Sequence, residues 1–185
     1  MTWYGCAAMP LAETVYVARV DTPIGPLRVA STASGLAYVE LPHESGSGLR
    51  GWAHRVLPHA QLLEGFAPNR AAITQLQEYL AGKRTDFELP LDLRGTAFQV
   101  TVWTALRGIP YGETRTYAEI ARAVERPRAL RAVGAANGAN PLALVVPCHR
   151  VVASGGKLGG YAGGLELKAR LLAMEQSRPA RGALL

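Results

Sequence analysis

The chain has 185 residues, 49% of them hydrophobic, which is enough for one good core or two small ones. No stretch approaches the roughly 20 apolar residues that a membrane span needs, and no signal peptide is visible, so we expect no membrane contact and a cytoplasmic location. The two cysteines, Cys6 and Cys148, stand far apart in unlike contexts, which favours a reduced protein without disulfides. The histidines and Cys6 show no recognisable zinc spacing, and we expect no metal.

The charge is unevenly distributed along the chain. Residues 1–92 hold 7 Lys and Arg against 9 Asp and Glu, a net charge of −2, whereas residues 93–185 hold 13 against 5, a net charge of +8. A basic half beside a nearly neutral half favours contact with a polyanion. A compositional bias explains the same asymmetry, because 17 of the 20 basic residues are arginine.

The first 92 residues are predicted to form a small α/β support domain without chemistry of its own. After a leader at 1–12, β-rich runs at 14–20, 27–32 and 36–41 are separated by turn residues and predict a three-stranded antiparallel sheet. A flexible link at 44–48 leads to a helix over 69–81, whose buried face carries Ile73, Leu76, Tyr79 and Leu80. Residues 86–93 are expected to be an extended linker between domains.

Residues 93–176 are predicted to form a mainly helical domain, followed by a flexible tail at 177–185. Thr96 with Gln99, and Thr116 with Glu119, fit the pattern of a capping box at a helix start. Pro127 suits the first turn of another helix, which would complete a helix-turn-helix with the short helix before it. That motif is a weak signal, since many helical hairpins bind nothing. A last helix is expected from residue 165. The predicted fold class is therefore α+β.

The second helix of the predicted helix-turn-helix is nearly bare of bulky side chains. Arg131 is followed by Ala132, Val133, Gly134 and Ala135, so one long cation stands out from a face of small residues. Such a face suits close packing against another helix. It also suits a helix pressed against DNA with Arg131 inserted.

Cys148 lies in the run Pro147-Cys148-His149-Arg150, with apolar residues on both sides. Pro147 stiffens the backbone at the thiol, and a thiolate formed with help from His149 and Arg150 would be a nucleophile. A buried structural cysteine is the plainer interpretation of the composition alone. Glu175, at the edge of the inward face of the last helix, could reach an inward histidine.

These motifs together resemble the O6-alkylguanine-DNA alkyltransferases, also called methylated-DNA–protein-cysteine methyltransferases. The resemblance runs from about Gly95 to Glu175, and residues 22–27 also look like the family's N-terminal domain. The matched blocks follow one another in the family's order and lie at residues 95–99, 109–114, 131–134, 137–141, 147–151, 160–164 and 171–175. The sequence departs from the family at Glu125 and Arg126, which replace a glycine and a small polar residue in the helix-turn-helix turn.

The resemblance implies a role for each matched residue. Cys148 would accept the alkyl group, with His149 as base through a bridging water, Glu175 orienting His149, and Asn140 holding the turn. Tyr117 would give a proton to the leaving guanine and help to rotate the nucleotide out. Arg131 would fill the vacated stack while Ala132, Gly134 and Ala135 approach the minor groove of double-stranded DNA. Val151, Tyr161 and Ala162 would frame the flipped base.

The resemblance therefore implies single-use DNA repair of O6-alkylguanine, and by extension O4-alkylthymine, by a monomer. Cooperative binding along DNA is left open. No cofactor is expected, because the transfer is a displacement at saturated carbon with the protein as acceptor. One alternative is a non-catalytic alkyltransferase-like lesion sensor, although that class lacks the cysteine. Another is a thiol hydrolase, which explains neither the helix-turn-helix nor Arg131.

Overall fold

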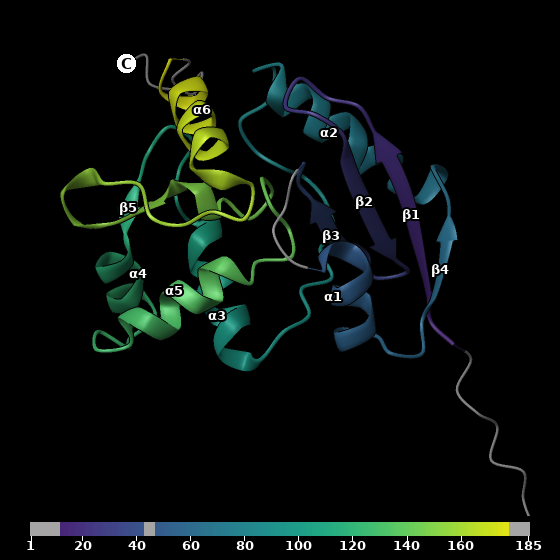
Figure 1. Ribbon diagram of the computed structural model, residues 1–185, viewed down its shortest axis with the longest axis horizontal. Helices are drawn as coiled ribbons and strands as arrows, with labels where there is room; N and C mark the ends of the chain where they lie inside the picture. The colour runs from purple at the N-terminus through teal and green to yellow at the C-terminus, as the bar shows by residue number, and fades with distance from the viewer. Residues whose placement is uncertain (1–11, 43–46, 178–185) are drawn as a thin grey trace, which may run out of the picture.

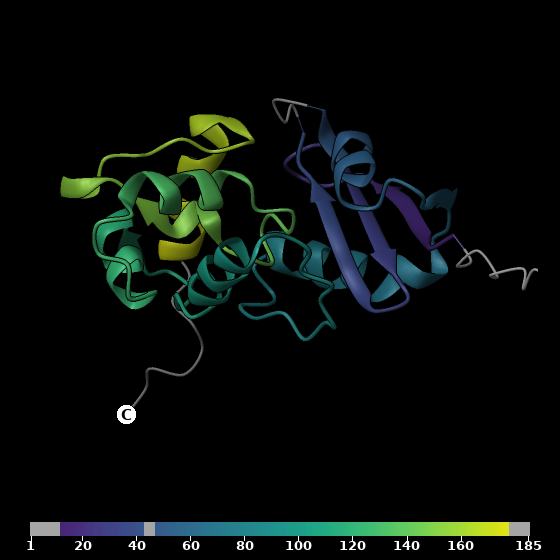
Figure 2. The same ribbon diagram turned by 90° about the horizontal axis from the view of Figure 1, so that it is seen from below.

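The computed structural model describes residues 12–42 and 47–177, and shows a sheet-containing N-terminal part beside a helical C-terminal part (Figures 1 and 2). This arrangement confirms the α+β prediction. The predicted leader, most of the flexible link at 44–48 and nearly all of the tail lie outside the described residues.

The N-terminal sheet contains the three predicted antiparallel strands and a fourth that was not predicted. Strands β1 (Thr14–Val20), β2 (Leu27–Thr32) and β3 (Gly35–Glu40) pair in succession. Strand β4 (Gln61–Glu64) then pairs parallel to β1, giving the order β3-β2-β1-β4 and a mixed sheet. All four side chains of β4 are exposed, so its sequence carries no alternation of buried and exposed residues that would predict a strand.

A helix covers each face of this sheet. Helix α1 (Gly48–Val56), which was not predicted, packs Leu49, Trp52 and Ala53 against one face. Helix α2 (Arg70–Leu80), entered through the short helix η1 (Ala67–Asn69), contributes to the core on the other face. The predicted inward residues of α2 are all buried, which confirms that helix: Ile73, Leu76, Tyr79 and Leu80.

The C-terminal part, as far as residue 177, contains four α-helices: α3 (Ala97–Arg107), α4 (Tyr117–Ala123), α5 (Leu130–Gly138) and α6 (Gly164–Gln176). Both predicted capping boxes are present, at the starts of α3 and α4. The prediction that Pro127 begins the next helix was wrong, because α5 starts three residues later. Pro127 instead occupies a turn in which the Ala129 N–H donates to the Arg126 carbonyl at 2.8 Å, a place where its fixed φ is favourable. Glu125, just before it, has a φ of +56°.

The remaining short elements belong to the C-terminal part, which contacts the N-terminal sheet through a hydrogen bond and a shared core. Strands β5 (Arg115–Thr116) and β6 (Val151–Val152) form a small parallel pair, flanked by the short helices η2 (Cys148–Arg150) and η3 (Ser154–Gly156). The Val39 N–H of β3 donates to the Pro141 carbonyl at 2.8 Å. One continuous apolar core contains residues from both parts, so the chain segment that leads to Cys148 is braced against the sheet. No helix among the described residues is long and apolar enough to cross a membrane.

Candidate active site

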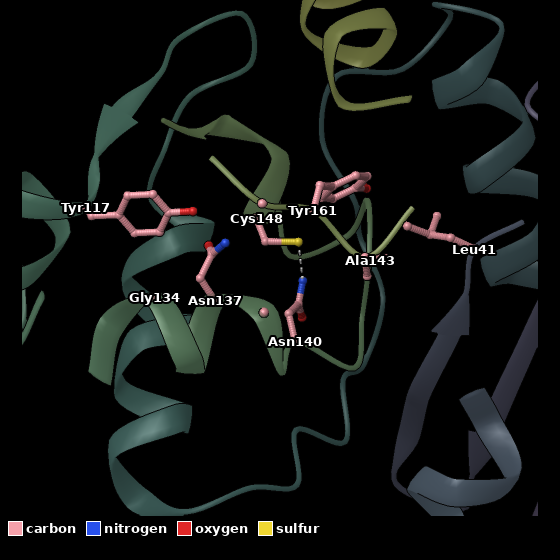
Figure 3. A pocket seen from close by; sticks show the side chains of 11 residues that line it. Leu41, Tyr117, Gly134, Asn137, Asn140, Ala143, Cys148 and Tyr161 are labelled. Carbon is pink, nitrogen blue, oxygen red and sulfur yellow. Dashed lines mark hydrogen bonds between the residues drawn. The ribbon is translucent and has the colours of Figure 1, made fainter. Parts of the chain in front are cut away.

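The thiol of Cys148 is held in the short helix η2 and is nearly buried. Cys148 is only 5% exposed, and the turn closes where the Arg150 N–H donates to the Pro147 carbonyl at 3.0 Å. Asn140 donates from Nδ2 to the Cys148 sulfur at 3.1 Å and to the Val146 carbonyl at 2.8 Å (Figure 3). Its Oδ1 accepts from the Leu142 N–H at 3.0 Å. One amide side chain thus fixes both the turn and the sulfur.

His149 and Arg150 both turn inward to meet Glu175 of α6. His149 and Glu175 are fully buried, and Arg150 is 6% exposed. The His149 Nε2 atom lies 2.9 Å from Glu175 Oε1, and Arg150 donates from Nε to Oε2 at 2.9 Å and from Nη2 to Oε1 at 2.9 Å. The Gly112 N–H also donates to Oε2, at 3.1 Å. The sequence predicted Glu175 at the edge of the buried face of the last helix. In the structure its carboxylate is fully enclosed by hydrogen-bond donors.

The electrostatics of this cluster favour an ionised glutamate and a neutral histidine. Burial alone would raise the pKa of Glu175, but hydrogen bonds from His149 and Arg150 outweigh it and bring the pKa to about 2. Burial lowers the pKa of His149, although Glu175 opposes the effect. Because Nε2 is turned to the carboxylate, Nδ1 is the nitrogen left to accept a proton, and it has no hydrogen-bond partner among the described residues. A neutral imidazole with Nδ1 available is suited to act as a base.

A cavity of about 380 Å³ opens onto the thiol (Figure 3). Tyr117 lies at one side of it, and Leu41, which follows β3 in the N-terminal part, lies at the other. The predicted pocket residues Tyr161 and Ala162 line the cavity, but Val151 does not, because it is buried in β6. The full lining consists of uncharged and mostly small residues: Leu41, Tyr117, Gly134, Asn137, Gly138, Asn140, Ala143, Cys148, Gly160, Tyr161 and Ala162.

Two of the predicted DNA-contacting residues, Tyr117 and Gly134, line this cavity, and the other three are exposed on α5. Arg131, Ala132 and Ala135 are exposed on α5, and Gly134 lines the cavity. Tyr117, the first residue of α4, is half-buried. Its pKa is raised mainly by burial and, to a smaller extent, by the nearby Cys148, so the phenol keeps its proton at neutral pH. Four arginines of the helix-turn-helix are exposed: Arg122, Arg126, Arg128 and Arg131.

Two buried polar side chains around this site make contacts that the sequence did not predict. Lys168 of α6 donates from Nζ to the Val151 carbonyl at 2.6 Å and to the Gly159 carbonyl at 3.1 Å, which ties the glycine-rich loop to β6. Tyr79 of α2 donates to Glu175 at 2.5 Å, so a side chain of the predicted support domain reaches the buried cluster beside Cys148. Periodicity shows that Tyr79 faces inward, but it cannot show which distant residue the hydroxyl meets. No group of three or more metal-binding side chains occurs within residues 12–42 and 47–177.

Two family models together match most of the chain. The 6-O-methylguanine DNA methyltransferase ribonuclease-like domain matches residues 13–93, and the DNA-binding domain of the same family matches residues 97–177. Relatives named methylated-DNA–protein-cysteine methyltransferase include one from Mycobacterium tuberculosis, 46% identical over 89% of this chain and 94% of the relative. Another, from Methanosarcina barkeri, is 45% identical over 88% of this chain and 98% of the relative. The crystal structure of Mycobacterium tuberculosis OGT in complex with DNA is also similar, with a TM-score of 0.75, 45% identity, and coverage of 90% of this chain and 96% of that chain.

Proposed function

We propose that this chain, which belongs to the 6-O-methylguanine DNA methyltransferase family, repairs DNA by moving an alkyl group from O6 of guanine onto its own Cys148. It is a methylated-DNA–protein-cysteine methyltransferase that acts on DNA. The position of Cys148 carries this assignment, because its thiol opens into a cavity lined by Tyr117 of α4 and Gly134 of α5, the two helices of the helix-turn-helix.

Transfer begins with the thiol giving up its proton to His149 through a bridging water. Glu175 holds the imidazole with Nδ1 available and stabilises the cation that forms. The sulfur then attacks the saturated carbon of the alkyl group, an S–C bond forms, and the bond between O6 and that carbon breaks. Tyr117 gives its proton to the leaving guanine, for which the phenol is suitably protonated at neutral pH. The phenolate then regains a proton from solvent, and the His149 cation releases the proton that it took from the thiol. Asn140 keeps the sulfur aimed into the cavity throughout.

The alkylated base must leave the helix before it can meet a nearly buried thiol, which costs a few kcal/mol of stacking and pairing. Arg131 compensates by entering the vacated stack, since its side chain projects from a face of small residues. Ala132, Gly134 and Ala135 let the α5 backbone approach the narrow minor groove closely. Tyr161, Ala162 and the backbone at Cys148 then frame the base in the cavity.

This mechanism assigns different roles to the two parts of the chain and limits each molecule to one reaction. Residues 93–176 bind DNA and carry out the transfer, and residues 1–92 support them. The thioether product is not hydrolysed, so each molecule acts once, as a monomer on duplex DNA. The same displacement serves O4-alkylthymine, because the reacting carbon is chemically equivalent.

The decisive experiment is intact mass spectrometry after mixing with duplex DNA that contains O6-methylguanine. One methyl group should be added per protein, on Cys148, and Cys148→Ala should bind the duplex without gaining mass. Binding without any mass increase in the native protein would identify a lesion sensor instead. Methyl removal well beyond one equivalent would contradict single use.

A further inference from the structure

We propose that Tyr79 is a positioning residue for alkyl transfer, and that through it the N-terminal part sets the alignment and basicity of His149. The proposal rests on the proposed function for its biological meaning. Its physical content concerns only the buried side chains Tyr79, Glu175 and His149. Tyr79 contacts neither DNA nor a reacting atom in the proposed mechanism, so its effect passes entirely through Glu175.

The geometry places the phenol of Tyr79 at the point where Glu175 meets His149. Tyr79 Oη donates to Glu175 Oε1 at 2.5 Å and lies 3.3 Å from His149 Nε2. The Nε2–H of His149 therefore faces two oxygen atoms, one from the carboxylate and one from the phenol. Both favour the tautomer in which Nε2 carries the hydrogen and Nδ1 is the base.

The phenol is held as firmly as the residues that it contacts. Tyr79 is fully buried at the end of α2, where its ring packs edge-on against Tyr111 with centroids 6.1 Å apart and tilted against Phe87 at 5.3 Å. Burial and the adjacent Glu175 raise the pKa of Tyr79 well above its ordinary value, so the hydroxyl remains a donor across the physiological range. Because α2 belongs to the sheet-containing part, the contact crosses between the two parts of the molecule.

The expected electrostatic effect follows from how the charge of Glu175 is shared. The hydrogen bond from Tyr79 partly neutralises the negative charge on Glu175 Oε1. Without this bond, the carboxylate would stabilise a protonated His149 more strongly. Removing the hydroxyl should therefore raise the pKa of His149 and reduce the fraction of neutral base near neutral pH. Several other groups face or influence His149 and must stay unchanged in the test: Cys148 and Arg150 on its own turn, Glu175 and Lys168 of α6, and the ring of Tyr161.

The test is Tyr79→Phe, which keeps the ring and removes only the hydroxyl. The first readout is the titration of His149 by NMR of its imidazole nitrogens, and we expect the pKa to rise by about half a unit to one unit. The second is the pH profile of Cys148 alkylation by iodoacetamide, mapped by peptide mass spectrometry, whose acid limb should move to higher pH by the same amount. Neither readout needs DNA, so a failure of the proposed repair function would appear separately, as native protein that does not react with O6-methylguanine duplex.

A matched control and a second variant make the result decisive. Tyr38→Phe removes a buried phenol from the other face of the sheet, where the ring lies against Trp52, and it should leave both profiles unchanged. If Tyr79→Phe does not fold, fluorotyrosine at position 79 keeps the shape but donates more strongly, and should move both profiles in the opposite direction. In a Glu175→Gln background the Tyr79 substitution should have little further effect. Profiles that superimpose on the native ones, or an undiminished effect in the Glu175→Gln background, would overturn the proposal.

Discussion

Glu175→Gln should destabilise the fold as well as slow the reaction, because the carboxylate is the only acidic group hydrogen-bonded to Arg150 among the described residues. The pKa of Glu175 falls from 4.5 to about 2 on folding, and at about 1.4 kcal/mol per pH unit this corresponds to about 3 kcal/mol of stability. An independent route gives a similar size, since removing one partner of a buried ion pair costs about 3 to 5 kcal/mol. We therefore expect Glu175→Gln to lower the free energy of unfolding by about 3 kcal/mol at pH 7.

The sign of the pH dependence makes this prediction specific. The folded pKa lies below the unfolded one, so the contribution is fully present above pH 4.5 and is lost as the pH falls towards 2. Urea unfolding followed by tryptophan fluorescence at several pH values measures the difference between native protein and variant. That difference should be greatest near neutral pH and should shrink through the acid range.

The matched control lies on the same helix. Glu166→Gln removes an exposed carboxylate from the first turn of α6 and should change stability by less than about 1 kcal/mol. A cost below about 1 kcal/mol for Glu175→Gln at pH 7, or a difference that does not vary with pH, would show that Glu175 does not hold Arg150 as described. Transfer by the variant, measured where it remains folded, should be about tenfold to a hundredfold slower, because the imidazole loses its partner.

Three further predictions concern DNA and the helix-turn-helix. Arg131→Ala should slow repair of duplex DNA at least about tenfold more than reaction with free O6-benzylguanine, which needs no flipping. Tyr117→Phe should slow both reactions. If Arg131→Ala slows both reactions equally, Arg131 supports the fold of the active site and does not enter the base stack. The logarithm of the association constant for duplex DNA should fall with the logarithm of the salt concentration at a slope of about −3 to −4, because each of the four exposed arginines would contact one phosphate. An affinity that does not vary with salt would argue against DNA binding by the exposed face of the helix-turn-helix. Glu125→Gly, at a φ of +56°, should raise the free energy of unfolding by about 1 kcal/mol, whereas Arg128→Gly, outside the positive-φ region, should lower it.

Locally encoded features of the fold were predictable from the sequence. The capping box of Thr96 and that of Thr116 each need residues only three positions apart, and both helices begin where those residues indicate. The inward face of α2 follows from its 3.6-residue period. Strand β4 was not predictable, because all of its side chains are exposed and show no pattern of burial. It is defined only by its parallel pairing with β1.

The site divides in the same way. Cys148, His149 and Asn140 lie within nine residues of one another, and their motifs are recognisable in the sequence. The contact of Tyr79 with Glu175 joins residues 96 positions apart, and a charged residue such as Lys168 shows its burial only when its carbonyl partners are in place. Glu125 illustrates the opposite case, because the glycine expected there by resemblance matches the positive φ that the backbone adopts with glutamate.

The core that spans both parts has a consequence for how the chain folds. The two family models divide the sequence near residue 95, yet the apolar cluster includes Leu36 and Leu76 from one side of that point and Val102 and Leu106 from the other. We therefore expect the two family domains to unfold together and not separately. Calorimetry should find one cooperative transition for both, and an excised C-terminal fragment should expose apolar surface and associate with itself.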